Sequence, residues 1–190
     1  MIQNKGTGAG GANTNANGKK FEEKTSNEPY LLANGYKRVA FSKNKYDYML
    51  EKTLEDGRKI MFFTQTGLKN YCNPKFGTQL FRKPDEAYLI QKGDSYTLKI
   101  LEKKDQNGPG SVDTKLLAGP GFIAEYKYLL GPKFQVEYAF CVSSFLQNKY
   151  QTESPEAKSL RQYLQEHNIP LLFGDAEDYF MKLNQWLMRS

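Results

Sequence analysis

Hydrophobic and polar residues alternate along this chain with two periods, one typical of strands and the other typical of helices. Short runs rich in β-branched and aromatic residues predict strands over 59–63, 87–90, 96–101, 134–143 and 169–173. Helical spacing predicts helices over 18–34, 112–130, 155–167 and 176–189, with a short helix or turn over 144–150. The order of these elements predicts an α/β (α+β) fold in which helices flank a central mixed sheet, with 134–143 at its centre.

Proline and glycine predict where two of these helices break. The first helix should be interrupted near Pro29, and Leu31 and Leu32 beyond it should both face the core. The helix over 112–130 should break near Gly119, which begins a Gly-Pro-Gly run. Each of these two helices is therefore expected as two pieces.

Polar residues predict further boundaries between elements. Lys92–Ser95 should form a hairpin turn. Ser111, Ser154 and Asp175 should each cap the helix that follows it. Residues 64–83 contain glycine and proline among aromatic residues, so we expect an irregular connection there with short strand or helical pieces.

Residues 1–17 are rich in glycine and asparagine and poor in apolar residues, so they cannot bury a hydrophobic face. We expect a flexible arm there, followed by a single domain over residues 18–190. The arm is either a disordered terminus or a segment that lies along DNA, where Asn13 and Asn15 would reach phosphates or a groove.

Composition narrows the function classes. The chain of 190 residues is 39% hydrophobic with a formal net charge of +6, which suits a polyanionic partner such as nucleic acid. Its cysteines, Cys72 and Cys141, lie far apart and predict buried free thiols in a reducing compartment. The sequence has no stretch typical of a membrane span or a secretory signal, so an intracellular (cytoplasmic) protein without a membrane partner is expected. His167, the only histidine, stands where a helix should end, so histidine-based catalysis and zinc binding are not favoured.

Acidic residues and a lysine meet near the ends of two adjacent predicted strands. Asp85 precedes the strand over 87–90, and Glu102 and Lys104 end the strand that follows. Because side chains alternate along a strand, Glu102 and Lys104 should point to one face and Lys103 to the other. Two carboxylates and the Lys103 backbone carbonyl are the hard oxygen ligands that Mg²⁺ prefers, and Lys104 would act on a water molecule. The pattern predicts a metal-dependent site that hydrolyses phosphodiesters.

The spacing of Glu102 and Lys104 is common in this lysine-rich chain. An acid followed two residues later by a lysine also occurs at Glu22, Asp113, Glu125 and Glu156. Glu102 differs because it ends an apolar strand and follows a Pro-Asp pair by one hairpin. The alternative is a surface hairpin whose charges keep the protein soluble.

The segments PDEAYL and ILEKKDQNGPGSVDTKL resemble the catalytic segment of PD-(D/E)XK type II restriction endonucleases. The segment KGTGAGGANTNANGKKFEE is similar to the amino terminus of such enzymes from large algal viruses and bacterial relatives. The resemblance implies a PD-(D/E)XK restriction-endonuclease-like core. In that core, three antiparallel strands near residues 60, 88 and 98 are followed by the crossover helix over 112–130 and the strand over 134–143.

The resemblance also implies roles for particular residues. Asp85 and Glu102 would bind the metal together with the Lys103 carbonyl, and Lys104 would be the catalytic lysine. The ion would be Mg²⁺, with Mn²⁺ able to substitute.

The first helix and the surface near the site are implied to take part as well. A glutamate of the first helix, Glu22 or Glu23, would reach the metal directly or through a ligand, with Glu23 preferred. Residues that would contact DNA are Gln106, Ser111, Lys115, Lys127 and Lys133. The lysines among them could equally be solvated surface residues.

These expectations favour a sequence-specific endonuclease that cuts double-stranded DNA with Mg²⁺. Because one chain has one site, double-strand cleavage implies a homodimer on a short palindrome, and a cognate DNA methyltransferase would accompany it. The alternatives are a structure-specific or repair endonuclease and a non-catalytic nucleic-acid-binding protein.

Overall fold

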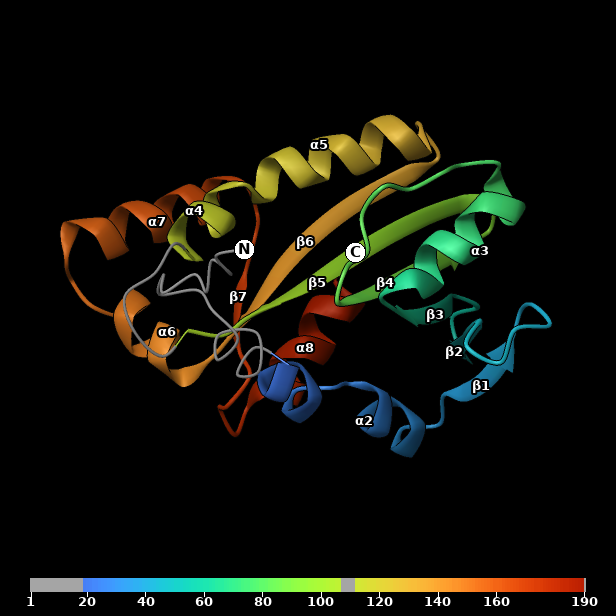
Figure 1. The fold of residues 1–190 in the computed structure, drawn as a ribbon, viewed down its shortest axis with the longest axis horizontal. Helices are drawn as coiled ribbons and strands as arrows, with labels where there is room; N and C mark the ends of the chain where they lie inside the picture. The colour runs from blue at the N-terminus through green and yellow to red at the C-terminus, as the bar shows by residue number, and fades with distance from the viewer. Residues whose placement is uncertain (1–18, 107–111, 190) are drawn as a thin grey trace, which may run out of the picture.

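The computed structural model of the protein describes residues 19–106 and 112–189 (Figure 1). Within these residues the strands are β1 (Lys37–Ala40), β2 (Tyr48–Thr53), β3 (Lys59–Thr64), β4 (Glu86–Lys92), β5 (Ser95–Lys104), β6 (Phe134–Val142) and β7 (Leu171–Phe173). A helical segment over residues 19–24 precedes the helices α2 (Glu28–Ala33), α3 (Thr66–Phe76), α4 (Val112–Leu117), α5 (Gly119–Leu130), α6 (Ser144–Tyr150), α7 (Pro155–Glu166) and α8 (Tyr179–Met188). The predicted arm over 1–17 with Asn13 and Asn15, and the predicted cap Ser111, lie outside the described residues.

The strands form one seven-stranded sheet in the order β1-β2-β3-β4-β5-β6-β7. Neighbours from β1 to β5 are antiparallel, whereas β5 with β6 and β6 with β7 are parallel. α4 and α5 form the crossover that a parallel β5–β6 pair requires. The expected mixed sheet flanked by helices is confirmed. β6 lies next to the edge strand rather than at the centre, because β1 and β2 extend the sheet beyond β3.

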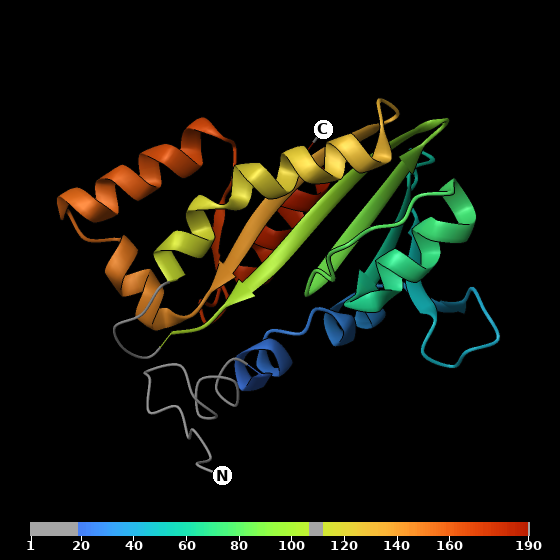
Figure 2. The ribbon, with the colours of Figure 1, turned by 45° about the horizontal axis from the view of Figure 1, so that its top comes forward.

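Helices cover both faces of the sheet (Figures 1 and 2). The helices from α3 to α7 pack on the face that buries Leu98 and Ile100 of β5. The segment 19–24, α2 and α8 pack on the opposite face, which buries Leu101. Successive residues of β5 therefore enter different hydrophobic cores, as the alternation of side chains along a strand requires.

The strands β1 and β2 were not predicted from the sequence. Short strand or helical pieces were expected within the connection over 64–83, and residues 66–76 form one regular helix of 11 residues, α3. Pro74 lies inside this helix, and such a residue argues against a helix at the level of sequence. Burial of Leu68 and Cys72 against the sheet stabilises the helix, so tertiary packing overrides the local preference.

The first helix breaks at a different place from the one expected. The helical residues 19–24 end before Thr25, and Pro29 falls in the first turn of α2, where a missing backbone amide is tolerated. Leu31 is buried as expected, but Leu32 is 44% exposed. Both leucines cannot face the core because adjacent helical residues point about 100° apart.

The last helix begins later than predicted, and Asp175 does not cap it. Asp178 occupies the N-cap position of α8. Asp175 Oδ2 instead accepts a 2.8 Å hydrogen bond from the Ser144 amide, and Oδ1 lies 2.6 Å from Lys24 Nζ. Asp175 therefore joins the segment 19–24 to the start of α6.

Other predicted boundaries agree with the structure. Ser154 caps α7 by accepting a 3.2 Å hydrogen bond from the Ala157 amide. Gly93 in the β4–β5 hairpin has φ +58°, a conformation that glycine adopts without steric cost. The crossover helix breaks between Leu117 and Gly119, where the break was expected.

Both cysteines and the histidine lie in the settings that were expected. Cys72 and Cys141 are buried free thiols, and burial raises the pKa of each to about 12. His167 is the C-cap residue of α7, and its Nδ1 lies 2.8 Å from the Tyr163 carbonyl oxygen. Within residues 19–106 and 112–189, none of the helices combines the length and the apolar character that a membrane-spanning helix needs.

Candidate active site

The register of β4 and β5 brings Asp85 and Glu102 together. Glu86 pairs with Leu101 in this antiparallel ladder, so the next step places Asp85 opposite Glu102. The Lys103 backbone amide donates a 2.7 Å hydrogen bond to Asp85 Oδ2 and orients that carboxylate. The two acids expected at the site therefore share one end of the sheet.

Lys104 lies on the same face of β5 as Glu102. Its Nζ lies 3.0 Å from Glu102 Oε1 and 3.1 Å from the Lys103 carbonyl oxygen. These are two of the oxygen atoms expected to bind a metal, so the ammonium group marks a position where oxygen ligands meet a cation. The Glu102 and Lys104 side chains are 22% and 18% exposed, so both are only partly accessible to solvent.

Burial raises the pKa of Glu102 above its ordinary value. Loss of solvation is the largest cause, Lys104 opposes it, and the negative charge of Asp85 adds to it. Ionised Glu102 is thus only partly compensated by its surroundings. A cation bound beside the two carboxylates would relieve this unfavourable environment.

The raised pKa predicts how Glu102→Gln affects stability. Below the ordinary glutamate pKa of about 4.3, the Glu102 carboxyl is neutral in both the folded and unfolded states, and its stabilising contribution is fully present. As the pH rises through the folded pKa, that contribution is lost because ionisation is harder in the folded state. The glutamine does not ionise, so the free energy of unfolding of Glu102→Gln should increase relative to wild type over this pH window.

Urea unfolding in the presence of a chelator, repeated across the pH range, measures this difference. Glu55 is exposed, so Glu55→Gln serves as the control and should show no comparable trend. A difference between Glu102→Gln and wild type that shrinks as the pH rises would contradict the expectation.

Glu22, rather than Glu23, faces the carboxylate pair. Burial raises the pKa of Glu22, and the negative charge of Asp85 is the next largest cause. Glu23 is exposed. The segment packs on the sheet through Phe21 and Thr25, and this orientation turns Glu22 toward the end of β5. The structure therefore favours Glu22 as the site glutamate, whereas Glu23 was preferred from the sequence.

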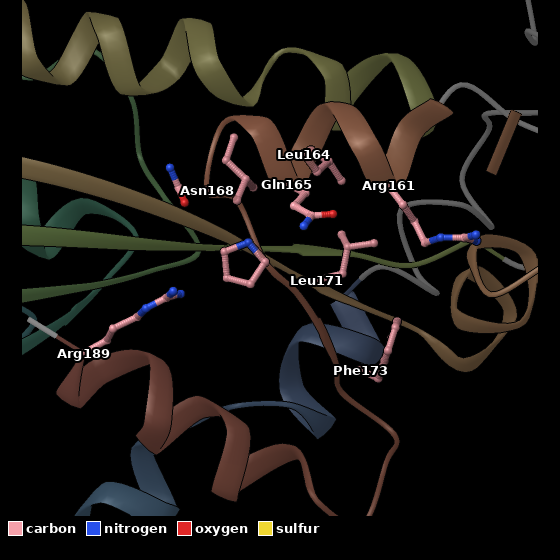
Figure 3. Close-up of a pocket in the computed structure, with 9 residues that line it drawn as sticks. Arg161, Leu164, Gln165, Asn168, Leu171, Phe173 and Arg189 are labelled. Atoms are coloured by element: carbon pink, nitrogen blue, oxygen red, sulfur yellow. The ribbon is translucent and has the colours of Figure 1, made fainter. Parts of the chain in front are cut away.

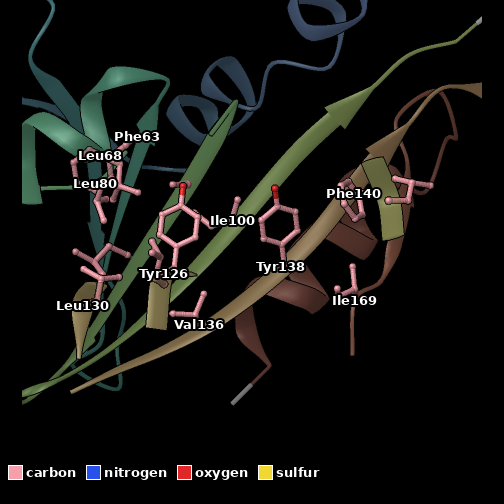
Figure 4. Packing of buried hydrophobic residues seen from close by; sticks show 14 of the residues in the cluster. Phe63, Leu68, Leu80, Ile100, Tyr126, Leu130, Val136, Tyr138, Phe140 and Ile169 are labelled. Atoms are coloured by element: carbon pink, nitrogen blue, oxygen red, sulfur yellow. The ribbon is translucent and has the colours of Figure 1, made fainter. Parts of the chain in front are cut away.

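Buried polar groups near the pair were not recognised from the sequence. Lys103 points to the opposite face of β5, as expected, but its ammonium is buried there and lies 2.7 Å from Glu86 Oε1. On the Glu102 face, Tyr126 and Tyr138 point their hydroxyls in the same direction (Figure 4). Burial raises the pKa of both tyrosines, and the Glu102 charge is the second cause. The buried contact between Lys103 and Glu86 could have been found from the sequence, because Lys103 stands at a core-facing position of an apolar strand.

Two of the residues expected on DNA lie at the same end of the sheet as the site. The Gln106 amide donates to Ser143 Oγ at 3.5 Å, and the Ser143 amide donates to the Lys104 carbonyl at 3.2 Å. Lys115 is exposed on α4, and α4 is joined to α6 through Asp113, which accepts from Lys149 and Tyr150 at 2.6 Å.

Lys127 and Lys133 lie at the opposite end of the sheet, and Lys127 lines a pocket with Gln135 and Val136 at the start of β6. The Lys133 carbonyl accepts a 3.0 Å hydrogen bond from the Tyr96 amide at the start of β5, whereas Lys104 ends this strand. With a rise of ~3.3 Å per residue, the two ends are about 25 Å apart. The structure therefore does not bring these two lysines to the carboxylate pair. Ser111, Asn13 and Asn15 lie outside the described residues.

The donor atoms at the site suit a hard cation. As they stand, the described residues contain no group of three or more acidic, histidine or cysteine side chains that could hold a metal ion. Mg²⁺ keeps several bound waters and takes only a few ligands from a protein. Two carboxylates and one carbonyl nevertheless meet this need. The Lys104 ammonium now contacts two of these oxygens, so an entering ion would displace it. The residues present therefore fit Mg²⁺.

A pocket of about 440 Å³ lies away from this site, between α7, β7 and α8 (Figure 3). Arg161, Leu171 and Arg189 are among its lining residues, and Asp85 and Glu102 are not. The carboxylate pair therefore lies outside this pocket.

Gly174 allows the segment 19–24 to pack closely on the sheet. A Cβ atom at this position would lie 2.7 Å from Thr25 Cγ2 and 2.8 Å from Cys141 Sγ. Gly174→Ala should therefore displace the segment that carries Glu22 and lower the free energy of unfolding by ~1–3 kcal/mol, which urea unfolding measures.

Gly121→Ala is the matched control for this substitution. A Cβ atom at Gly121, inside α5, would meet nothing within 4 Å. Alanine there should raise the free energy of unfolding by ~0.5–1 kcal/mol, because glycine is unfavourable within a helix. Equal stability of the Gly174→Ala and wild-type proteins would show that the close packing is not as described.

No protein-family model, curated protein or solved structure matches this chain. Its function must therefore be inferred from the chemistry of the site and from the resemblance of the segments that form it.

Proposed function

We propose that the protein is a Mg²⁺-dependent type II restriction endonuclease of the PD-(D/E)XK class, which hydrolyses phosphodiester bonds in double-stranded DNA at a short palindromic site. The observation that carries the proposal is the convergence of Asp85, Glu102 and the Lys104 ammonium at one end of β4 and β5. The passage from antiparallel strands through a crossover helix to a parallel strand supports a core of that class.

The residues at the site divide the chemistry between them. Asp85, Glu102 and the Lys103 carbonyl would hold Mg²⁺, and Glu22 would face it from the segment 19–24. When bound, the ion would stabilise charge on the phosphate and lower the pKa of a water molecule. Lys104 would orient this water and balance the charge that develops on the phosphate, because its ammonium lies on the face that presents Glu102.

Cleavage of both DNA strands requires two such sites. A two-fold homodimer would supply them and would read a palindrome. Gln106 and Lys115, at the site end of the sheet, would contact the strand being cut, and the amino-terminal arm and loops would read bases. A cognate DNA methyltransferase would protect the host DNA, and the buried free thiols suit an enzyme that works inside the cell.

Digestion of a long DNA of known sequence tests the proposal. With Mg²⁺ or Mn²⁺ we expect discrete bands whose ends map to one short palindrome. Cutting confined to branched or damaged DNA would instead identify a structure-specific or repair endonuclease. Binding to DNA without cutting, under any divalent ion, would leave a nucleic-acid-binding protein.

Lys104→Ala should separate metal binding from cleavage. Because the ammonium contacts Glu102 Oε1 and the Lys103 carbonyl, its removal frees both oxygens for Mg²⁺. Titration calorimetry should show tighter Mg²⁺ binding, while the cleavage rate falls by about 10²–10⁴-fold. Lys158→Ala, on the surface of α7, should change neither quantity. Weaker Mg²⁺ binding by the Lys104→Ala protein would show that the ammonium and the ion do not share a position.

A further inference from the structure

Lys103 and Glu86 form an ion pair inside the protein. Lys103 is 6% exposed and Glu86 is 2% exposed, and Lys103 Nζ lies 2.7 Å from Glu86 Oε1. Glu86 also accepts hydrogen bonds from the backbone amide and the side-chain amide of Asn27. A buried ion pair adds little net stability compared with apolar residues, so its presence next to the candidate site calls for a different explanation.

The Lys103 ammonium makes two further bonds, both to the segment that carries Glu22. It donates to the Thr25 carbonyl at 2.8 Å and to the Glu22 carbonyl at 3.3 Å. Carbonyls at the end of a helical segment have no partner within the helix, and a cation is favoured there. Lys103 therefore fastens the end of the segment 19–24 to β5.

The backbone of Lys103 is bonded to the active-site residues themselves. Its amide donates to Asp85 Oδ2 at 2.7 Å, and its carbonyl accepts from Lys104 Nζ at 3.1 Å. Glu102 precedes it in the chain, and its partner Glu86 follows Asp85. One residue thus connects the three elements that present acidic groups to the site.

We propose that Lys103 is a positioning residue, whose buried ammonium holds the Glu22 segment in fixed relation to Asp85 and Glu102. This role rests on the proposed function. Its chemical consequence is that Glu22 would be held on the side of Asp85 and Glu102 before Mg²⁺ binds, so the ion would not have to order the segment first. Loss of the ammonium should therefore weaken Mg²⁺ binding rather than DNA binding.

A second buried lysine on the same strand provides a matched control. Lys99 lies four residues earlier on the same face of β5, and it donates to the Trp186 and Arg189 carbonyls at 2.8 Å. It also lies 2.9 Å from Glu137 Oε2. Lys99 therefore fastens the end of α8 in the way that Lys103 fastens the segment 19–24, but it lies away from the carboxylate pair.

The test compares K103M/E86Q with K99M/E137Q and wild type. Each double variant removes both charges, so neither leaves an unpaired buried charge. Hydrogen exchange of residues 19–28 and Mg²⁺ binding by titration calorimetry are measured without DNA, and kcat and KM are measured with DNA. For K103M/E86Q we expect about tenfold faster exchange in 19–28. We also expect Mg²⁺ affinity to fall by about 10–100-fold, with lower kcat at unchanged KM. For K99M/E137Q we expect the exchange rates of residues 19–28 and the Mg²⁺ affinity to equal those of wild type.

Wild-type exchange and wild-type Mg²⁺ affinity in K103M/E86Q would overturn the proposal, as would equal effects of the two double variants. The unmodified protein provides a measurement that does not depend on variant folding. The amides of Thr25 and Asn27 donate hydrogen bonds to the Phe21 carbonyl and to Glu86 Oε1, so they should be protected to the same degree as those of β5. Exchange of these two amides at the rate of a fraying terminus would also overturn the proposal. If the wild-type protein neither binds Mg²⁺ nor cuts DNA, the proposed function fails, while exchange in 19–28 still decides whether Lys103 holds the segment.

Discussion

Glu102→Ala should abolish DNA cleavage, and Mg²⁺ should no longer stabilise the protein against thermal unfolding. Glu102 is the carboxylate that the Lys104 ammonium contacts and that lies opposite Asp85. Its removal eliminates an ion ligand, so the rate should fall on the order of 10³-fold or more, which corresponds to about 4 kcal/mol of transition-state stabilisation. In the wild-type protein, Mg²⁺ at 100 times its Kd should add about 2.7 kcal/mol to the free energy of unfolding. The variant should lose this increment, which a thermal melt with and without Mg²⁺ measures.

The matched control is Glu156→Ala, because Glu156 has the same spacing to a lysine but lies exposed on α7. This variant should cut DNA and respond to Mg²⁺ as wild type does. Asp85→Ala should resemble Glu102→Ala in both measurements. Cleavage by the Glu102→Ala protein at the wild-type rate would show that the site lies elsewhere.

Glu86→Ala should be among the most destabilising single substitutions in the chain. The substitution leaves the buried Lys103 ammonium without its carboxylate and leaves the Asn27 amide without its acceptor. Removing one partner of a buried ion pair costs about 3–5 kcal/mol. Urea unfolding at neutral pH, with the midpoint and slope both fitted, measures the loss.

Lys158→Met is the control for this prediction, because Lys158 and Glu153 form an ion pair whose side chains are 56% and 77% exposed. Solvent screens such a pair, so little change in stability is expected there. If Glu86→Ala lowered the free energy of unfolding as little as Lys158→Met does, the Lys103 ammonium would have to reach water, which contradicts the buried geometry described above.

The strands that carry the site could be predicted from the sequence, and the edge of the sheet could not. β4 is buried from Ala87 to Ile90, and these four residues form an uninterrupted apolar run. β1 is mostly exposed along its length, which leaves no hydrophobic period to detect. α3 contains Pro74 and few apolar residues, so only its contacts with the sheet determine that it is helical.

Within the candidate site, the sequence could place the residues that follow from local geometry, but not those whose position depends on distant contacts. Asp85 and Glu102 follow from one hairpin and the alternation of side chains, which are local rules. The choice between Glu22 and Glu23 depends on how a short helical segment is rotated, and distant residues such as Gly174 set that rotation. No local pattern reports such long-range contacts.

The alternation along β5 also limits how this protein can change during evolution. β5 is hydrogen-bonded on both sides, antiparallel to β4 and parallel to β6, so its register is held twice. Insertion or deletion of one residue between Tyr96 and Leu101 would exchange the faces of Glu102 and Lys103, placing a carboxylate in the core and a lysine in the site. Descendants of this chain should therefore vary in this segment by substitution, and differences in length should collect in the loops on either side of it.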